Sequence, residues 1–363
     1  MPTSFADEDW SIIAGFLPER WEQGAIEFKA LQRARGVSNP EALLRLILHV
    51  TTGLSLRQTS ARARVLGLAD ISDVALLKRL RAAEPWLRGL CQEMTSRVVE
   101  RVSELPARFA NRRLRAIDAT TVQEAGAVGA SWRLHFSICM PSLQCDFFEL
   151  TDYKGGETFR RFPAQPGDIL LADRGYAHRQ GVAHLVAHEA DYVVRLVAQS
   201  FPLLTKKGTK FDAHSEFVRL THAPRAWDVF FEAHGRRYPA RLCAVRKSAV
   251  ATERARIKAI RKSARNGSLA PDAENLALAE FVYVLTSLPA ESFSAATILE
   301  LYRLRWQIEL VFKRLKGLLD LGHLPKYDPA SCRAWLQAKM LCALLIHELI
   351  TKACLFSPWG YEL

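Results

Sequence analysis

The spacing of apolar residues divides the chain into a helical N-terminal part and a strand-rich part that begins at about residue 112. In the N-terminal part, apolar residues recur at helical spacing between glycines and capping residues. Ser55 is the expected N-cap of one short helix, and Ser72 or Asp73 is that of the next, over 75–81. Two short helices joined by a glycine-containing turn suit a helix-turn-helix, although an ordinary helical bundle with basic surface residues explains the same pattern.

Short runs in the second part have the composition and spacing of strands. The runs are Leu114–Thr121, Arg133–Cys139, Cys145–Thr151, Asp168–Asp173 and Asp191–Val197. The first strand is predicted to end at Asp118 and the fourth at Asp173. Three consecutive strands followed by alternating helices and strands predict an α/β fold, with a mixed sheet flanked by helices rather than a sandwich.

Residues 198 to about 245 contain further short β-like runs, which predict a mainly β insertion. These runs are Glu216–Leu220, Trp227–Phe231 and Tyr238–Leu242, and Pro239 would confine the last of them to a sheet edge. Residues 246–265 then carry eight basic side chains against one acid. Such a one-sided run is expected to face a polyanion, with a solvated helix as the alternative.

A predicted strand, Phe281–Leu285, precedes one long helix expected from about Ser294 to Leu319. One stripe of this helix, about 60° wide, carries four polar residues, Tyr302, Arg305, Glu309 and Lys316. An amphipathic helix with a mixed-charge stripe is the ordinary explanation, but it does not account for an acid among cations when two strands also end in aspartate. Carboxylates held at a sheet edge are ligands that Mg²⁺ prefers.

The charge balance narrows the class of partner. The chain has 50 Lys and Arg against 38 Asp and Glu, a net charge of +12, which favours nucleic acid first and an anionic membrane second. The acidic N-terminus is not a secretory signal, and the most apolar run, Met340–Ile346, is shorter than the roughly 20 residues of a membrane span. Seven cysteines without a C-x-x-C pair predict reduced thiols in a cytosolic protein. The sequence contains no glycine-rich nucleotide-binding motif, which argues against nucleotide-driven chemistry.

The four polar residues of the long helix match the Tyr-(2)-Arg-(3)-Glu-(6)-Lys pattern of bacterial insertion-sequence transposases of the DDE type, the insertion sequence four family. Asp118 and Asp173 resemble the first and second catalytic aspartates of that family, and Glu309 its glutamate. The resemblance implies an RNase H-like core, a β-rich insertion before the glutamate helix and an N-terminal DNA-binding region. The corresponding divisions are 1–107 for the helical DNA-binding domain, 108–197 and 279–350 for the core, 198–278 for the insertion and 351–363 for a C-terminal tail.

The resemblance also implies the chemistry. Two Mg²⁺ ions, roughly 3.5–4 Å apart and replaceable by Mn²⁺, would be held by Asp118, Asp173 and Glu309. One ion would activate water and later a DNA 3′-hydroxyl, and the other would stabilise the leaving oxygen of an in-line phosphoryl transfer.

Several side chains are expected to contact DNA. By resemblance, Tyr302, Arg305 and Lys316 contact phosphates near the cleaved end, and Trp306 either stacks on a base or packs at the core edge. Other expected contacts are Arg57, Lys78 and Arg79 in the N-terminal domain and Arg254, Lys258 and Arg261 in the basic helix. Some relatives stabilise a flipped base with a Trp on the strand before the glutamate helix. Here that strand has Phe281 and Tyr283, so a hairpin route of excision stays open.

These residues predict a transposase that binds its element's terminal inverted repeats, cleaves them and joins them to target DNA. The resemblance suggests a homodimer in the synaptic complex, acting in the bacterial cytoplasm at the nucleoid and not at a membrane. Two alternatives are an RNase H-like nuclease without strand transfer and a non-catalytic DNA-binding protein derived from a transposase. Retention of all three acids argues against the second alternative.

Overall fold

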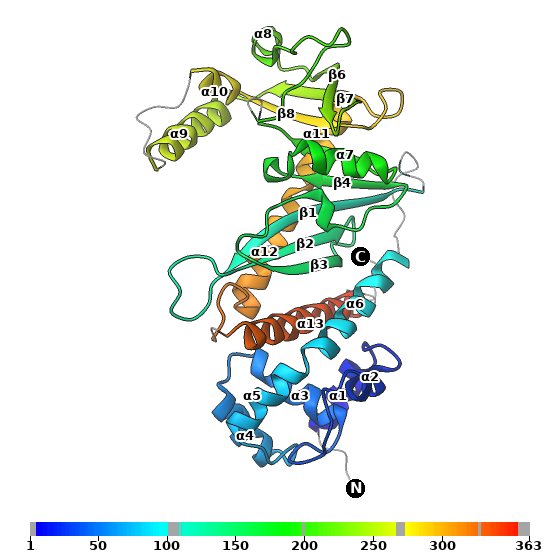
Figure 1. The fold of residues 1–363 in the computed structure, drawn as a ribbon, viewed down its shortest axis with the longest axis vertical. Coiled ribbons are helices and arrows are strands. Elements are labelled where there is room, and N and C mark those ends of the chain that lie inside the picture. The colour runs from blue at the N-terminus through cyan, green and yellow to red at the C-terminus, as the bar shows by residue number, and fades with distance from the viewer. Residues whose placement is uncertain are drawn as a thin grey trace.

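A computed structural model describes residues 5–100, 109, 111–197, 200–265, 273–325 and 328–354. The molecule is elongated, with N-terminal helices at one end and a twisted sheet rising from them (Figure 1). Of the predicted C-terminal tail, residues 351–354 end the last helix, and residues 355–363 lie outside the described part.

The N-terminal part is helical, as the apolar spacing predicts. Its helices are α1 (Phe5–Ala14), α2 (Trp21–Glu27), α3 (Pro40–Thr51), α4 (Leu56–Val65), α5 (Asp73–Ala82) and α6 (Glu84–Glu100). Ser55 caps α4 by accepting a hydrogen bond from the Gln58 N–H at 3.2 Å, and Ser72 caps α5 by accepting from the Ala75 N–H at 3.2 Å. Both hydroxyls satisfy backbone donors that a helix start leaves open.

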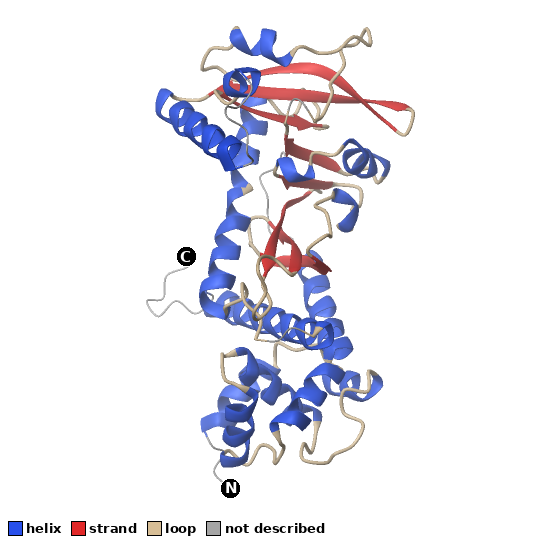
Figure 2. Ribbon diagram, turned by 60° about the vertical axis from the view of Figure 1, so that its left-hand side comes forward, coloured by secondary structure: helices blue, strands red, loops and turns tan. Residues whose placement is uncertain are grey.

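Helix α13 (Pro329–Cys354) connects the N-terminal helices to the rest of the molecule. It packs against α6, α3 and α5, and Arg81 of α5 reaches its start through Asp328 at 2.9 Å and Ser331 at 2.8 Å. By length and composition alone, residues Pro329–Lys352 of this helix would be long and apolar enough to cross a membrane. More than half of that stretch is buried inside the protein, as in a core helix. Figure 2 shows the helix crossing between the N-terminal helices and the rest of the molecule.

An eight-stranded mixed sheet forms the body of the described molecule. Its strands are β1 (Arg113–Val122), β2 (Trp132–Cys139), β3 (Cys145–Asp152), β4 (Asp168–Ala172), β5 (Asp191–Arg195), β6 (Arg225–Ala233), β7 (Arg236–Arg246) and β8 (Phe281–Thr286). The strand order is β3-β2-β1-β4-β5-β8-β7-β6. The first three strands pair antiparallel, whereas β4 and β5 run parallel to β1. This order and direction of the first five strands is the expected RNase H-like core.

Helices cover both faces of the sheet. α11 (Ala295–Leu304) and α12 (Trp306–Leu319) lie on one face, and α7 (Arg179–Ala187) lies on the other. Ala116 and Leu171 point into the core under α11 and α12, whereas Ile117 and Leu170 point into the core on the α7 side. Because side chains alternate along a strand, Asp118 and Asp173 fall on the same face as α12.

Between β5 and β8 the chain forms α8 (Ala213–Val218), the hairpin β6–β7, α9 (Ala249–Arg265) and α10 (Ala273–Leu278). The predicted β runs of β6 and β7 and the basic helix α9 are all present. The hairpin extends the sheet through β8, so this segment continues the sheet rather than forming a separate one.

Two expectations about strands are wrong. β1 does not end at Asp118 but continues to Val122, paired with β2, whereas its pairing with the shorter β4 stops at Ala116. Asp118 therefore lies just beyond the stretch of β1 that β4 covers. Pro239 does not mark an edge strand, because β7 lies between β8 and β6. The proline is tolerated because pairing with β8 begins only at Arg241.

Two expectations about helices also change. The run Glu216–Leu220 is not a strand, because Asp212 caps α8 by accepting a hydrogen bond from the third residue of that helix. The predicted long helix is interrupted at Arg305, which separates α11 from α12. The Arg305 N–H donates to the Tyr302 carbonyl at 3.2 Å, a tight 3₁₀-type bond that locally winds the chain.

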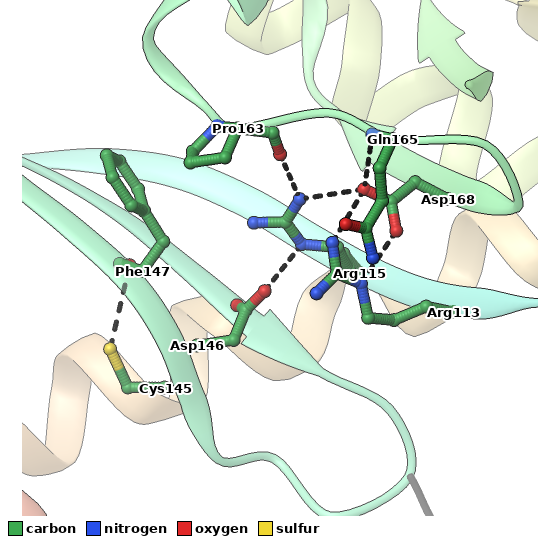
Figure 3. A network of polar contacts seen from close by, with 8 residues as sticks. All are labelled: Arg113, Arg115, Cys145, Asp146, Phe147, Pro163, Gln165 and Asp168. Atoms are coloured by element: carbon green, nitrogen blue, oxygen red, sulfur yellow. Dashed lines mark hydrogen bonds and ion pairs between the residues drawn. The ribbon is translucent and has the colours of Figure 1, made fainter. Parts of the chain in front are cut away.

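A buried charge network fixes the start of β4 against β1 (Figure 3). The Asp168 carboxylate, fully buried, accepts from Arg113 at 2.6 and 2.7 Å and from Arg115 at 3.2 Å. Arg115 is also paired with Asp146 of β3 at 2.6 Å and donates to the Pro163 carbonyl at 2.6 Å. The network thus joins β1, β3, β4 and the loop before β4.

We expect Asp168→Ala to lower the free energy of unfolding by about 3–5 kcal/mol, because it removes the buried partner of Arg113 and one of the two carboxylates paired with Arg115. Urea unfolding followed by circular dichroism measures the loss. The matched control is Asp70→Ala, whose carboxylate pairs with Arg64 and is 77% exposed, with an expected loss below about 1 kcal/mol. Equal small losses for both variants would contradict the structural role of the network.

Candidate active site

The parallel register of β1 and β4 brings two predicted aspartates together. Arg113 pairs with Asp168 and Ala116 with Leu171. The same register continued by two residues sets Asp118 beside Asp173, which directly follows β4. Both carboxylates therefore lie at the edge where β4 stops.

Arg305 connects the first aspartate to the glutamate of the long helix. Its Nη1 lies 3.6 Å from Asp118 Oδ2, and its Nη2 donates to Glu309 Oε1. The Arg305 side chain is only 11% exposed. One guanidinium, at the break between α11 and α12, thus faces carboxylates from β1 and α12.

Tyr302 connects the same helical segment to the second aspartate. Its hydroxyl donates a hydrogen bond to Asp173 Oδ1 at 3.3 Å. Burial, together with the neighbouring Asp173 carboxylate, raises the pKa of Tyr302 to about 12. The hydroxyl therefore stays protonated and remains a donor. Through Arg305 and Tyr302, the structure brings Asp118, Asp173 and Glu309 into one network.

The ionised form of Asp118 is less stable in the folded protein than in water. Burial raises the pKa of Asp118 to about 6, and the carboxylates of Glu157 and Asp173 add to the rise. The Ala119 N–H, 2.8 Å from Oδ1, and the Arg305 guanidinium act in the opposite direction. A further cation near Asp118 would therefore stabilise its ionised form.

The donor atoms suit a divalent cation, since they are carboxylate oxygens gathered from β1, the end of β4 and α12. As arranged in the described part of the chain, no three Asp, Glu, His or Cys side chains lie close enough together to hold a metal ion. The guanidinium of Arg305 provides the positive charge between Asp118 and Glu309. Binding of a cation by all three acids thus requires Arg305 to move.

Two further predicted DNA contacts of the glutamate helix, Trp306 and Lys316, lie on the surface. Trp306 is 55% exposed, so more than half of its surface is open to solvent. Lys316 is exposed in the last turn of α12. On β8, Phe281 and Tyr283 contact Phe217, with ring centroids 5.3 and 5.2 Å apart, so both aromatic rings take part in core packing.

The remaining predicted DNA contacts lie away from the carboxylates, at the two ends of the molecule (Figure 1). On α4 and α5, Arg57 and Lys78 are exposed, whereas Arg79 donates to backbone carbonyls of the loop before α3, Arg33 and Arg35. On α9, three exposed basic side chains at i, i+4 and i+7 share one face, namely Arg254, Lys258 and Arg261.

Sequence reasoning missed Glu157 and Tyr176. Glu157 lies in the loop between β3 and the 3₁₀ turn Phe159–Arg161, with its carboxylate 3.7 Å from Arg133 Nη1. Tyr176 ends the 3₁₀ turn that follows Asp173 and is fully buried. The only sequence signal for Glu157 is the pair of glycines before it, a weak indication of a loop that approaches another segment closely.

Comparison with known proteins supplies the family. The family model of the transposase DDE domain matches residues 151–345. A putative transposase, InsL, for insertion sequence element IS186A of Escherichia coli (strain K12) is 35% identical over 366 residues, which cover 98% of this chain and 97% of that protein. This chain belongs to the bacterial insertion-sequence DDE transposases.

A second relative in sequence agrees with that assignment. The transposase for insertion sequence element IS421 of Escherichia coli is 35% identical over 367 residues, with 98% of this chain and 97% of that protein covered. A cryo-EM structure of the piggyBac transposase synaptic complex with hairpin DNA has 9% sequence identity and a TM-score of 0.43, covering 94% of this chain and 74% of that chain. The strand order of the sheet defines the fold of this transposase.

The raised pKa of Asp118 predicts a pH-dependent effect on stability. Asp118→Asn is expected to stabilise the metal-free protein at pH 7.5 by about 1–3 kcal/mol, because one pKa unit corresponds to about 1.4 kcal/mol. The folded pKa is about 6 and the ordinary value is 3.8. The gain should therefore vanish below about pH 4, grow between about pH 4 and 6, and be constant above.

Urea unfolding in EDTA at several pH values measures this difference between variant and wild type. A stabilisation that does not change between about pH 3.5 and 7.5 would contradict a buried, anionic Asp118.

Proposed function

We propose that this transposase cleaves the ends of its own insertion sequence and joins them to target DNA, with Asp118, Asp173 and Glu309 as catalytic carboxylates. One observation carries the proposal. Asp118 and Asp173 lie at least 136 positions before Glu309 in the sequence. All three carboxylates nevertheless contact one of two nearby side chains, Arg305 or Tyr302. A core that needed these acids only for solubility would not gather them at one sheet edge.

We propose Mg²⁺ as the cofactor, with Mn²⁺ able to substitute, held by the three carboxylates. Such ions, when bound, neutralise the acids and polarise a DNA phosphate for in-line displacement. Tyr302 orients Asp173 by donating its hydroxyl hydrogen bond. Arg305, released from Asp118 and Glu309, is then free to bind a phosphate near the cleaved end, with Lys316 contacting the backbone further along α12.

We propose three DNA-contacting regions. Trp306, exposed beside Arg305, stacks on a base near the cut. The exposed Arg57 and Lys78 bind the terminal repeat. Arg79 instead donates to the backbone of the loop before α3. The basic face of α9 binds the flanking backbone of terminal or target DNA. Since two ends are cut together, we infer a homodimer in the synaptic complex, acting in the bacterial cytoplasm at the nucleoid.

Asp118→Ala should reduce cleavage more than about 1,000-fold while leaving binding to the terminal repeat within about twofold, since charge stabilisation by metals is worth several kcal/mol. The substrate is the DNA that flanks the gene, incubated with Mg²⁺ and read for 3′-hydroxyl nicks at nucleotide resolution. A gel-shift assay on the same DNA measures binding. The control is Glu149→Gln, an acid on β3 paired with Arg161, which should retain cleavage.

A plasmid target in the same reaction tests the alternatives. Strand-transfer products support a transposase, whereas nicks without joining would indicate a nuclease. Binding by the wild type without any cleavage would indicate a non-catalytic DNA-binding protein. Loss of cleavage and binding together in Asp118→Ala would count against the assigned role.

The α9 surface predicts a change in salt dependence. Replacing Arg254, Lys258 and Arg261 by alanine should reduce the slope of log affinity against log salt by about 2–3, because each phosphate contact contributes roughly 0.9. Fluorescence anisotropy with duplex DNA at several salt concentrations measures this slope. Arg256→Ala is the control on the same helix, because its guanidinium is already paired with Glu280. An unchanged slope in the triple variant would exclude α9 from the DNA interface.

A further inference from the structure

Glu157 is a fourth acid at the edge where Asp118 and Asp173 meet. Its carboxylate lies against the 3₁₀ turn Arg174–Tyr176, which directly follows Asp173. The side chain is 32% exposed and comes from the loop after β3 rather than from β1, β4 or α12. Glu157 therefore comes from none of the elements that carry Asp118, Asp173 and Glu309.

A glycine shapes the position of this carboxylate. A Cβ atom at Gly175 would lie 1.9 Å from Glu157 Oε2 and 3.1 Å from its carboxyl carbon. Gly175 belongs to the 3₁₀ turn Arg174–Tyr176 that directly follows Asp173. The carboxylate of Glu157 thus rests against the backbone of the turn that directly follows the second aspartate, and a side chain at position 175 would displace it from that place.

A buried hydroxyl without a partner belongs to the same turn, one residue after Gly175. Tyr176 is fully buried, and its hydroxyl has no hydrogen-bond partner among the described residues. Burial raises the pKa of Tyr176, and the next causes are the charges of Asp118 and then Glu157. An unpaired buried hydroxyl costs free energy, so the Tyr176 hydroxyl is a donor available to a ligand that Asp118 and Glu157 would share.

Pairing with Arg133 is the structural alternative for Glu157. The two groups are 3.7 Å apart, and both are partly exposed, at 24% and 32%. A partly exposed pair at this distance contributes little to stability. It does not explain why the carboxylate is placed beside another acid, an arrangement that is unfavourable unless a cation or a proton offsets it.

We propose that Glu157 is a fourth carboxylate of the catalytic site and that it binds a divalent cation together with Asp118, with the Tyr176 hydroxyl as hydrogen-bond donor at that position. The inference rests on the proposed role of Asp118. It assigns to the loop after β3 a direct part in cation binding, and to Gly175 the role of leaving room for the fourth carboxylate.

The test is Mn²⁺ binding to the full chain without DNA, measured by isothermal titration calorimetry and by the electron paramagnetic resonance signal of free Mn²⁺. Glu157→Gln should weaken binding at least about tenfold, in the range seen when groups around a metal are removed. Gly175→Ala should weaken it similarly, although every carboxylate is retained. Glu149→Gln, which removes a carboxylate of similar exposure, 39%, should leave binding unchanged.

Arg133→Gln separates the proposal from the structural alternative. If Glu157 binds the cation, loss of its arginine partner leaves Mn²⁺ affinity unchanged or tighter. If Glu157 only pairs with Arg133, then Arg133→Gln and Glu157→Gln should have the same effect on melting temperature and none on Mn²⁺ affinity. That result would overturn the inference. Because neither variant alters the core, each reports on the folded chain.

Asp118→Asn distinguishes this inference from the proposed function. If Asp118→Asn loses Mn²⁺ binding while Glu157→Gln keeps it, the fourth carboxylate is wrong and the three-acid site stands. If Asp118→Asn keeps both Mn²⁺ binding and DNA cleavage, the proposed catalytic role of Asp118 is wrong as well.

Discussion

The site depends on the buried ion pairs that hold β4 in register with β1. Asp168 accepts from Arg113 and Arg115, which in turn reaches Asp146 on β3. A shift of β4 by one residue would break these bonds and would turn Asp173 to the opposite face of the sheet. The buried charges therefore specify geometry at the other end of the same two strands, where the aspartates project toward α12.

Charge compensation is the second constraint. Three acids at one edge repel each other unless cations lie among them. The protein supplies one such cation, the guanidinium of Arg305, at the break between α11 and α12. The same side chain belongs to the motif expected to bind DNA phosphate. Exchange of Arg305 between carboxylates and phosphate would couple occupation of the site by cations to arrival of DNA.

Local patterns carried much of the fold and part of the site. Alternation and turn residues located the strands of Asp118 and Asp173, and serine caps located α4 and α5. Helical spacing placed Glu309 on a stripe with its neighbours, and family resemblance gave these residues a role. The helix α8 depends on a local cap at Asp212, which the β-like run Glu216–Leu220 did not reveal. The break at Arg305, which pairs with Asp118, and the approach of Glu157 to Gly175 were not predictable, because each involves contacts between segments separated in the chain.

The continuity of the sheet has a mechanical consequence. β8 joins β5 of the core to the β6–β7 hairpin, and α9 follows β7 directly. At its base, α9 is held by the Arg256–Glu280 pair and by Lys247, which donates to the Ala279 carbonyl. The cationic surface and the acids at the edge of β4 therefore sit on a single stiff frame. If α9 binds DNA as proposed, a duplex that also reaches these acids must span the fixed distance between them. That distance would set the number of base pairs between the bound segment and the cleaved bond.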